Sequence, residues 1–162
     1  ASFKGTLFLL ALVGFGTNTD GSHITQPNRA TMGGALKLAL ESANLSPDAI
    51  GYVNGHGTAT KHGDIAETGA TRDVFGRRVT ISSLKSYMGH TLGACGAIEA
   101  WLSIQMMNKS WFAPNLNLVN PDPECADLDY IQGAGRDLDA EYIMSNNFAF
   151  GGINSSLIFK RT

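Results

Sequence analysis

The segment from residue 90 to residue 108 limits the fold of this chain most, because its apolar residues have helical spacing and leave no polar face. These apolar residues are Leu92, Ala94, Cys95, Ala97, Ile98, Ala100, Trp101, Leu102, Ile104 and Met106. A helix that is apolar all round is normally buried on all sides. The segment therefore predicts a helix that lies between layers of structure and not at the surface.

The rest of the chain alternates strand and helix patterns. Strands are expected at residues 6–13, 50–53, 79–82, 128–131, 141–148 and 153–160, and further helices at residues 30–43 and 64–75. The first strand is a continuous apolar run, which indicates full burial, and Asp64 with Glu67 has the spacing of an N-cap and capping box. The last two strands, joined by AFGG, predict a hairpin. The pattern predicts an α/β fold with one mixed sheet of about five strands, helices on both faces and a C-terminal antiparallel hairpin.

Length and composition exclude several classes of protein. The 162 residues suffice for one domain with its own core, and a net charge of −2 without a basic stripe argues against nucleic-acid binding. The apolar run near residue 1 is too short to span a bilayer, so no membrane span is expected. Cys95 and Cys125 lack metal-ligand spacing, so neither a disulfide framework nor a metal site is expected, and the cytoplasm is the expected location.

Glu99 is the main anomaly of the apolar helix, because a buried carboxylate needs a partner. Lys85 lies just before the helix and could reach back to form an ion pair with Glu99. The alternative is that Glu99 faces a wet seam, and the residues alone leave the two interpretations even.

Two histidines could act together on one substrate atom. His56 follows a predicted strand, where α/β sheets place their sites, and His90 lies at the predicted helix start. A helix N-terminus favours a neutral imidazole, whose N–H can donate to a developing oxyanion. Each histidine alone is more often structural. His23 is expected on a channel wall and His62 at the surface.

Two Gly-rich stretches have both a functional and an ordinary interpretation. In NGHGTATKHGD, the glycines would let a ligand approach, and Thr58 and Thr60 would present two hydroxyls on one side. The ordinary alternative is a strand-to-helix turn. In NNFAFGGIN, Phe150 could be a mobile aromatic on a Gly-Gly hinge that gates an apolar tunnel, and the alternative is a tight hairpin turn with two core aromatics.

Three motifs together resemble the C-terminal half of the β-ketoacyl-acyl carrier protein synthases of the thiolase superfamily. HGTATKHGDIAE is similar to the family's "HGTGT..GD..E", KSYMGHTLGACG to "K…GH..GAAG", and FAFGGIN to "FGFGGTN". The similarity runs from about Val13 to the end of the chain in the family's order and spacing. It implies a thiolase-like half-fold.

The resemblance also implies a reaction, the decarboxylative Claisen condensation of malonyl-acyl carrier protein with an acyl thioester in fatty acid or polyketide synthesis. His56, His90 and Lys85 would be catalytic, with support from Glu99, Asp64 and Glu67. The family's substrate-binding positions match Thr58, Thr60, Phe150, Phe148 and Gly151, of which the two threonines would hold the phosphopantetheine arm and Phe150 would donate its backbone N–H. No tightly bound cofactor and no metal are implied, because the carrier protein's phosphopantetheine brings the substrate.

The chain also departs from the family pattern. The departures are Asn54-Gly55 for Glu-Ala, Ala59 and Ala149 for glycines, Ile153 for threonine and Cys95 for alanine. The family's nucleophilic cysteine belongs to an N-terminal half of similar fold, and neither Cys95 nor Cys125 matches it. The chain is therefore expected to be one half of a synthase that pairs with the N-terminal half, binds acyl carrier protein and self-associates. The alternatives are a non-condensing relative, either a malonyl decarboxylase or a chain-length partner, and a carrier-protein-binding module.

Overall fold

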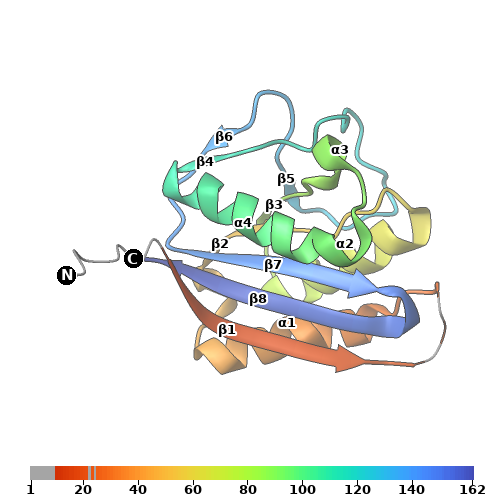
Figure 1. The fold of residues 1–162 in the computed structure, drawn as a ribbon. Coiled ribbons are helices and arrows are strands. Elements are labelled where there is room, and N and C mark those ends of the chain that lie inside the picture. Colours follow the sequence, from red (N-terminus) through yellow and green to blue (C-terminus); the bar gives the residue numbers. More distant parts are fainter. Residues whose placement is uncertain (1–9, 22, 24) are drawn as a thin grey trace.

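A mixed sheet organises the chain in the computed structural model, which describes residues 10–21, 23 and 25–162 (Figure 1). Within these residues, six strands pair in the order β1-β8-β7-β2-β3-β5. The strands are β1 (Leu10–Thr19), β2 (Ile50–Asn54), β3 (Thr80–Ser82), β5 (Asp129–Tyr130), β7 (Tyr142–Ala149) and β8 (Ile153–Arg161). Strands β7, β2, β3 and β5 run parallel, whereas β8 is antiparallel to both β7 and β1. The expected mixed sheet and C-terminal hairpin are confirmed.

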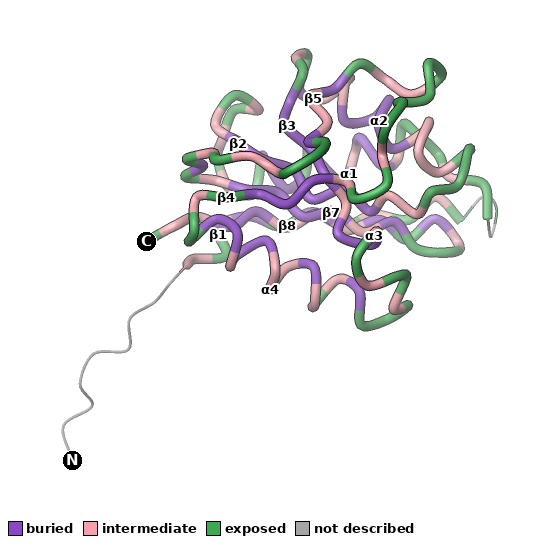
Figure 2. Tube along the Cα trace, turned by 90° about the horizontal axis from the view of Figure 1, so that it is seen from above, coloured by how far each residue is buried: buried purple, intermediate pink, exposed green. Residues whose placement is uncertain are grey.

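Helices cover both faces of this sheet (Figure 1). The α-helices are α1 (Arg29–Ala43), α2 (Lys61–Phe75), α3 (Lys85–Met88) and α4 (Cys95–Asn108), and the 3-10 helices are η1 (Pro47–Ala49), η2 (Leu92–Ala94) and η3 (Phe150–Gly152). Helices α1 and α2 pack on one face through a core that includes Leu36, Val53 and Met144. Helix α4 packs on the other face through a second core that includes Met107 and Ile143. Figure 2 shows the buried residues concentrated along the sheet and the inner sides of the helices.

Strand β1 differs from the sequence prediction in both position and burial. The predicted strand covered residues 6–13, of which residues 6–9 lie outside the described residues, whereas β1 continues beyond the predicted end to Thr19. It pairs with β8 along its whole length, from Leu10 opposite Arg161 to Thr19 opposite Ile153. Strand β1 is at the edge of the sheet, and its Leu12 and Phe15 side chains remain 57% and 55% exposed. The prediction of full burial was wrong, because apolar composition does not distinguish an edge strand from a central one.

The apolar helix is shorter than predicted and is covered on one face only. His90 lies in a loop between α3 and η2, and α4 begins at Cys95. Helix α4 turns Glu99 and Ser103 toward the sheet, where both side chains are 0% exposed. On its other side Trp101 is 60% exposed, so the described residues of this chain do not bury the helix on all sides.

Helix α2 begins earlier than the sequence pattern predicted. Thr60 is its N-cap and Lys61 its first residue, so Asp64 lies inside the helix and not at its cap. The capping-box assignment of Glu67 was wrong for the same reason, and its side chain turns instead toward the preceding loop. A small antiparallel sheet of β4 (Trp111–Phe112) and β6 (Arg136–Asp137) also forms, at positions where no strand was predicted.

Candidate active site

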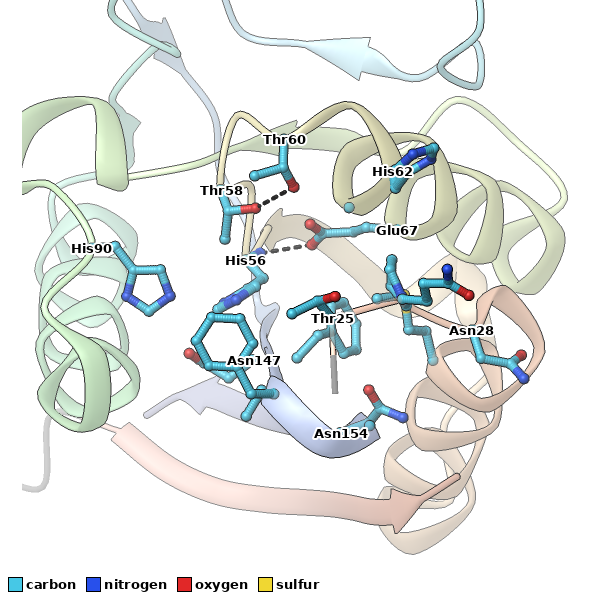
Figure 3. A pocket seen from close by; sticks show the side chains of 18 of the residues that line it. Thr25, Asn28, His56, Thr58, Thr60, His62, Glu67, His90, Asn147 and Asn154 are labelled. Carbon is cyan, nitrogen blue, oxygen red and sulfur yellow. Dashed lines mark hydrogen bonds between the residues drawn. The ribbon is translucent and has the colours of Figure 1, made fainter. Parts of the chain in front are cut away.

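A pocket of about 870 Å³ opens at the carboxyl ends of strands β2 and β7 (Figure 3). The segment between β1 and α1 contributes His23 and Thr25 to one wall, and the start of α2 contributes His62. The opposite wall comes from the loop around His90, and the floor comes from the end of β7. The topology thus brings the three motif-bearing segments to one cavity, in the position where α/β sheets place their ligands.

His56 rests on an ion pair beneath this pocket. The Lys85 ammonium donates a hydrogen bond to the Glu99 carboxylate, and Lys85 Nζ also lies 3.3 Å from His56 Nδ1. The two side chains are 5% and 0% exposed, so Glu99 forms a buried ion pair with Lys85 and does not face a wet seam. An ammonium can only donate, so His56 Nδ1 accepts and the neutral ring carries its proton on Nε2.

His90 reaches the same point from the other side. Its ring lies edge-on to that of His56, with ring centroids 5.3 Å apart and an angle of 89° between the planes. The backbone N–H of Leu92 donates to His90 Nδ1 at 3.0 Å, so a neutral His90 ring also carries its proton on Nε2. Both imidazoles line the pocket (Figure 3). The arrangement can offer two N–H donors to one oxygen atom, and it uses a loop position for His90, not the helix N-terminus predicted.

The electrostatics keep His56 neutral. Burial, together with the smaller effects of the positive charge of Lys85 and the neighbouring His90, lowers the pKa of His56 to about 3. Burial also raises the pKa of Glu99, although the hydrogen bond and charge of Lys85 oppose this effect. A neutral His56 retains one lone pair for Lys85 and one proton for a ligand.

The loop that carries His56 is tied down from below by Glu67. This carboxylate accepts the backbone N–H of His56 at 2.6 Å and that of Gly57 at 2.7 Å, as the dashed line in Figure 3 shows for His56. Burial raises the pKa of Glu67 to about 7, against the lowering effect of these two N–H groups. Gly57 has φ +42, and a Cβ there would lie 2.6 Å from Ser83 Cβ, so the loop requires glycine at this position.

The two predicted threonines also lie in this loop, at the pocket wall. Thr58 Oγ1 and Thr60 Oγ1 are 3.0 Å apart, so the hydroxyls share one side of the segment as expected. Asp64 faces back toward this turn: burial raises its pKa, and hydrogen bonds from the backbone N–H groups of Ala59, Thr58 and Thr60 oppose the rise. Ala59 has φ +57, which is unusual for a residue with a side chain.

The hairpin residues meet the pocket at different depths. Phe148 is 8% exposed and lies edge-on to His56 at 6.1 Å between ring centroids, whereas Phe150 is 69% exposed. Phe148 and Phe150 both line the pocket, whereas Gly151, with φ +80, is not among its lining residues. The exposed Phe150 ring is thus carried by η3, a turn that continues into two glycines of positive φ.

Asn147 is a pocket residue that sequence reasoning missed. Its amide Nδ2 donates to Glu99 Oε2 at 3.3 Å, and its Oδ1 accepts from Cys95 Sγ at 3.1 Å. A signal was present, because strand alternation puts Asn147 on the same face of β7 as Ser145. Asparagine is common enough that this signal alone carries no chemistry.

Neither cysteine forms a disulfide, since both thiols are free. Cys95 is buried at the first turn of α4, and Cys125 lies in the loop before β5. Within the described ranges, no group of three or more His, Cys, Asp or Glu residues could hold a metal ion. No helix of that same part of the chain has both the length and the apolar character needed to cross a bilayer.

The sequence matches a family model described as beta-ketoacyl synthase, C-terminal domain, over residues 9–119. It is 42% identical to 3-oxoacyl-[acyl-carrier-protein] synthase 2 of Staphylococcus aureus, over 99% of this chain and 40% of that protein. The same-named protein of Vibrio harveyi is 39% identical, over 99% of this chain and 40% of that protein. The chain thus spans about two fifths of the length of these relatives.

Solved structures show the same similarity. A crystal structure of a β-ketoacyl synthase from Burkholderia phymatum has a TM-score of 0.92 and 64% sequence identity, covering 93% of this chain and 37% of that one. A ketosynthase solved in complex with its chain length factor from Xenorhabdus doucetiae has a TM-score of 0.88 and 34% identity, covering 95% of this chain and 39% of that one. A type II polyketide synthase complex of an acyl carrier protein with its ketosynthase has a TM-score of 0.90 and 31% identity, covering 95% of this chain and 39% of that one. These similarities bear out the thiolase-like half-fold that the motifs implied.

Proposed function

This chain belongs to the β-ketoacyl synthase family, whose C-terminal domain it matches, and we propose that it is the C-terminal catalytic half of a 3-oxoacyl-acyl carrier protein synthase. The reaction would be the decarboxylative condensation of a malonyl thioester with an acyl thioester, in fatty acid or polyketide synthesis. The observation that carries this proposal is the edge-on pair of His56 and His90, with ring centroids 5.3 Å apart and both Nδ1 atoms engaged.

The histidine pair would stabilise the enolate formed from the malonyl group. When the bond between the methylene carbon and the carboxylate breaks, CO₂ leaves and its bonding electron pair forms an enolate on the thioester. His56 and His90 would each donate an Nε2–H to the thioester oxygen as negative charge builds up on it. Two donors held in place before the reaction stabilise that charge without reorganisation, which is why a preorganised site is effective.

Lys85 would act on His56 from below. Its ammonium points at His56 Nδ1, which keeps the imidazole neutral and its Nε2–H directed into the pocket. Glu99 would hold Lys85 in that position, and Glu67 and Asp64 would support the loop that carries His56. These four residues would therefore set the orientation and charge of the histidine pair.

The phosphopantetheine arm of an acyl carrier protein would enter along Thr58 and Thr60. Supporting this role, both hydroxyls lie on one side of the loop, 3.0 Å apart, at the pocket wall. Phe148 would pack against the thioester end of the pocket, and the backbone N–H of Phe150 would stabilise the acyl oxyanion. Gly151 would give Phe150 the freedom to move when the acyl chain enters.

The acyl-holding thiol would come from an N-terminal half of the synthase and not from Cys95 or Cys125. Cys95 is buried in a helix with its thiol bonded to Asn147, and Cys125 lies outside the histidine motifs. The partners we propose are that N-terminal half, acyl carrier protein and a second copy of the chain, and the location we propose is the cytoplasm. No tightly bound cofactor is part of the proposal.

The test is to incubate the purified chain with malonyl- and acyl-carrier protein and to follow the carrier proteins by intact mass. We expect slow loss of CO₂ from the malonyl group, with no acylated cysteine and no β-ketoacyl product. His56→Ala or His90→Ala should abolish the decarboxylation, and Cys125→Ala, at a position outside this pocket, is the control. Decarboxylation that is undiminished in His56→Ala would overturn the proposed role of the pair.

A chain-length partner is the second candidate, because one similar structure pairs a ketosynthase with a chain length factor. Such a protein would bind carrier protein without decarboxylating malonyl groups. The complete set of His56, Lys85 and His90 favours the catalytic assignment, since a non-catalytic partner has no need of a neutral His56 on a buried ion pair with a second imidazole beside it. Carrier-protein binding without any decarboxylation would favour the partner.

A further inference from the structure

Asn147 occupies the junction of three elements beneath the pocket. It projects from β7, and its side chain contacts α4 at two points, the Cys95 thiol and the Glu99 carboxylate. The approach is close because Gly96 has no side chain: a Cβ there would lie 3.3 Å from Asn147 Nδ2. Asn147 also lines the same pocket as His56 and His90 (Figure 3).

The amide of Asn147 has only one orientation that satisfies both neighbours. A carboxylate accepts and cannot donate, so Nδ2 must face Glu99 Oε2. The Cys95 thiol is then the donor that reaches Oδ1, at 3.1 Å from Sγ. If the amide rotated by half a turn, Oδ1 would face the Glu99 carboxylate and two acceptors would repel each other. The thiol of Cys95 therefore helps to hold the amide in its productive orientation.

The Glu99 carboxylate is held by a different group at each oxygen. Lys85 donates to Oε1 and Asn147 donates to Oε2. Because Glu99 is 0% exposed, water cannot replace either donor. The position of Glu99, and through it the position of Lys85 beneath His56, depends on both bonds.

We propose that Asn147, with its amide held by the Cys95 thiol, is a positioning residue that orients the Glu99–Lys85 pair beneath His56. This proposal rests on the proposed function for the step that is affected, the decarboxylation of the malonyl thioester. Asn147 acts through Glu99 and Lys85 on the direction of the His56 Nε2–H. Cys95 has a structural role as a hydrogen-bond donor and is not a nucleophile. A side-chain hydrogen bond between Asn147 and His56 opposes the lowering of the His56 pKa by burial, so Asn147 also lies beside that ring.

The experiment compares four substitutions in the full chain. Asn147→Leu removes both hydrogen bonds, Cys95→Ala removes the donor that holds the amide, and Cys95→Ser keeps a donor of similar size. Cys125→Ala is the matched control for a cysteine substitution outside the site. The first readout is the kinetics of malonyl-carrier protein decarboxylation, because a small displacement of reacting groups can cost about a hundredfold in rate.

We expect Asn147→Leu to lower kcat about tenfold to a hundredfold with little change in KM. Cys95→Ala should lower kcat by a smaller factor, and both Cys95→Ser and Cys125→Ala should match the unsubstituted chain. If the role of Cys95 were only to fill space, the buried hydroxyl of Cys95→Ser would be no better than Cys95→Ala. Equal rates for Cys95→Ala and Cys95→Ser would therefore overturn the proposal.

A second readout separates this proposal from the proposed function. The chain has four histidines, so the imidazole NMR signal of His56 can be assigned by its loss in His56→Ala. In Asn147→Leu and Cys95→Ala the His56 signal should move or split, and in Cys95→Ser and Cys125→Ala it should stay in place. This result would support the positioning role even if no carrier-protein substrate reacted, and an unmoved His56 signal in Asn147→Leu would refute it.

Discussion

The buried pair of Lys85 and Glu99 supplies the sharpest test of how this site is held together. The Lys85 and Glu99 side chains are 5% and 0% exposed, so solvent does not screen the pair. Removing one partner of such a pair leaves an uncompensated buried charge and typically costs about 3–5 kcal/mol. Because a domain of this kind is stable by only about 5–15 kcal/mol, Lys85→Met should lose a large part of the free energy of unfolding.

The double substitution Lys85→Met with Glu99→Leu should be less damaging than the sum of the two single ones. It leaves no buried charge, and the remaining costs are the unpaired Nδ2 of Asn147, which donates to Glu99 Oε2 in the intact chain, and the unpaired Nδ1 of His56, which accepts from Lys85. A buried polar group without a partner costs about 1–3 kcal/mol. We therefore expect each single variant to lose about 3–5 kcal/mol and the double variant about 2–6 kcal/mol, less than the sum of about 6–10 kcal/mol from the two single variants.

The assay is urea unfolding followed by tryptophan fluorescence, since the chain has two tryptophans. The pH dependence of the free energy of unfolding gives a second test, because the direction of the change follows from the pKa of Glu99. Burial raises the pKa of Glu99, so in Lys85→Met the folded state binds a proton more readily than the unfolded state does. Relative to the unsubstituted chain, the loss of stability in this variant should therefore be smallest at low pH and grow as pH rises above about 4.5, the ordinary range of a glutamate. Additive losses in the double variant, or a loss in Lys85→Met that is the same at every pH, would refute the reasoning.

Four further predictions follow from particular residues. Gly57→Ala should lower the free energy of unfolding by about 2–4 kcal/mol, from a positive φ and an overlap with Ser83, and urea unfolding that matches the parent would contradict this. Ala59→Gly should raise it by about 0.5–1 kcal/mol in the same assay, because glycine tolerates the φ of +57, and a loss of stability would count against that strain. His56, with a pKa of about 3, stays neutral while the unfolded state takes up a proton near pH 6.5, so stability should fall by up to roughly 5 kcal/mol between pH 6.5 and pH 3. His56→Gln should flatten that part of the unfolding curve, and an unchanged slope would show that other groups cause it. The chain should self-associate through the apolar face of α4, where Trp101 is 60% exposed, and Trp101→Glu should shift sedimentation toward the monomer; a parent chain that stays monomeric at high concentration would exclude this surface.

Much of the candidate site was predictable because its chemically active residues lie in short sequence motifs. The anomaly of Glu99 in an apolar helix left an ion pair with Lys85 and a wet seam as even alternatives, and the structure shows the ion pair. The two histidines could be expected to act on one atom, because His56 follows a strand, His90 lies shortly after the end of the neighbouring strand, and parallel neighbouring strands end at the same edge of a sheet. By contrast, Glu67 was assigned to helix capping because its spacing from Asp64 fits a capping box, and the structure uses it to hold the His56 loop.

The sequence by itself determined the order and type of the main helices and strands, the fold class, and which short segments carry titratable groups. These properties depend on local periodicity and on residue types at close spacing. Only the tertiary structure decided that β1 is an edge strand, that α4 buries one face, and that Asn147 meets Cys95 and Glu99. Asn147 lies 52 residues from Cys95 and 48 from Glu99 along the chain. Contacts at that separation depend on strand register and on how closely a helix approaches the sheet, here through the bare Cα of Gly96, and no local pattern encodes either of them.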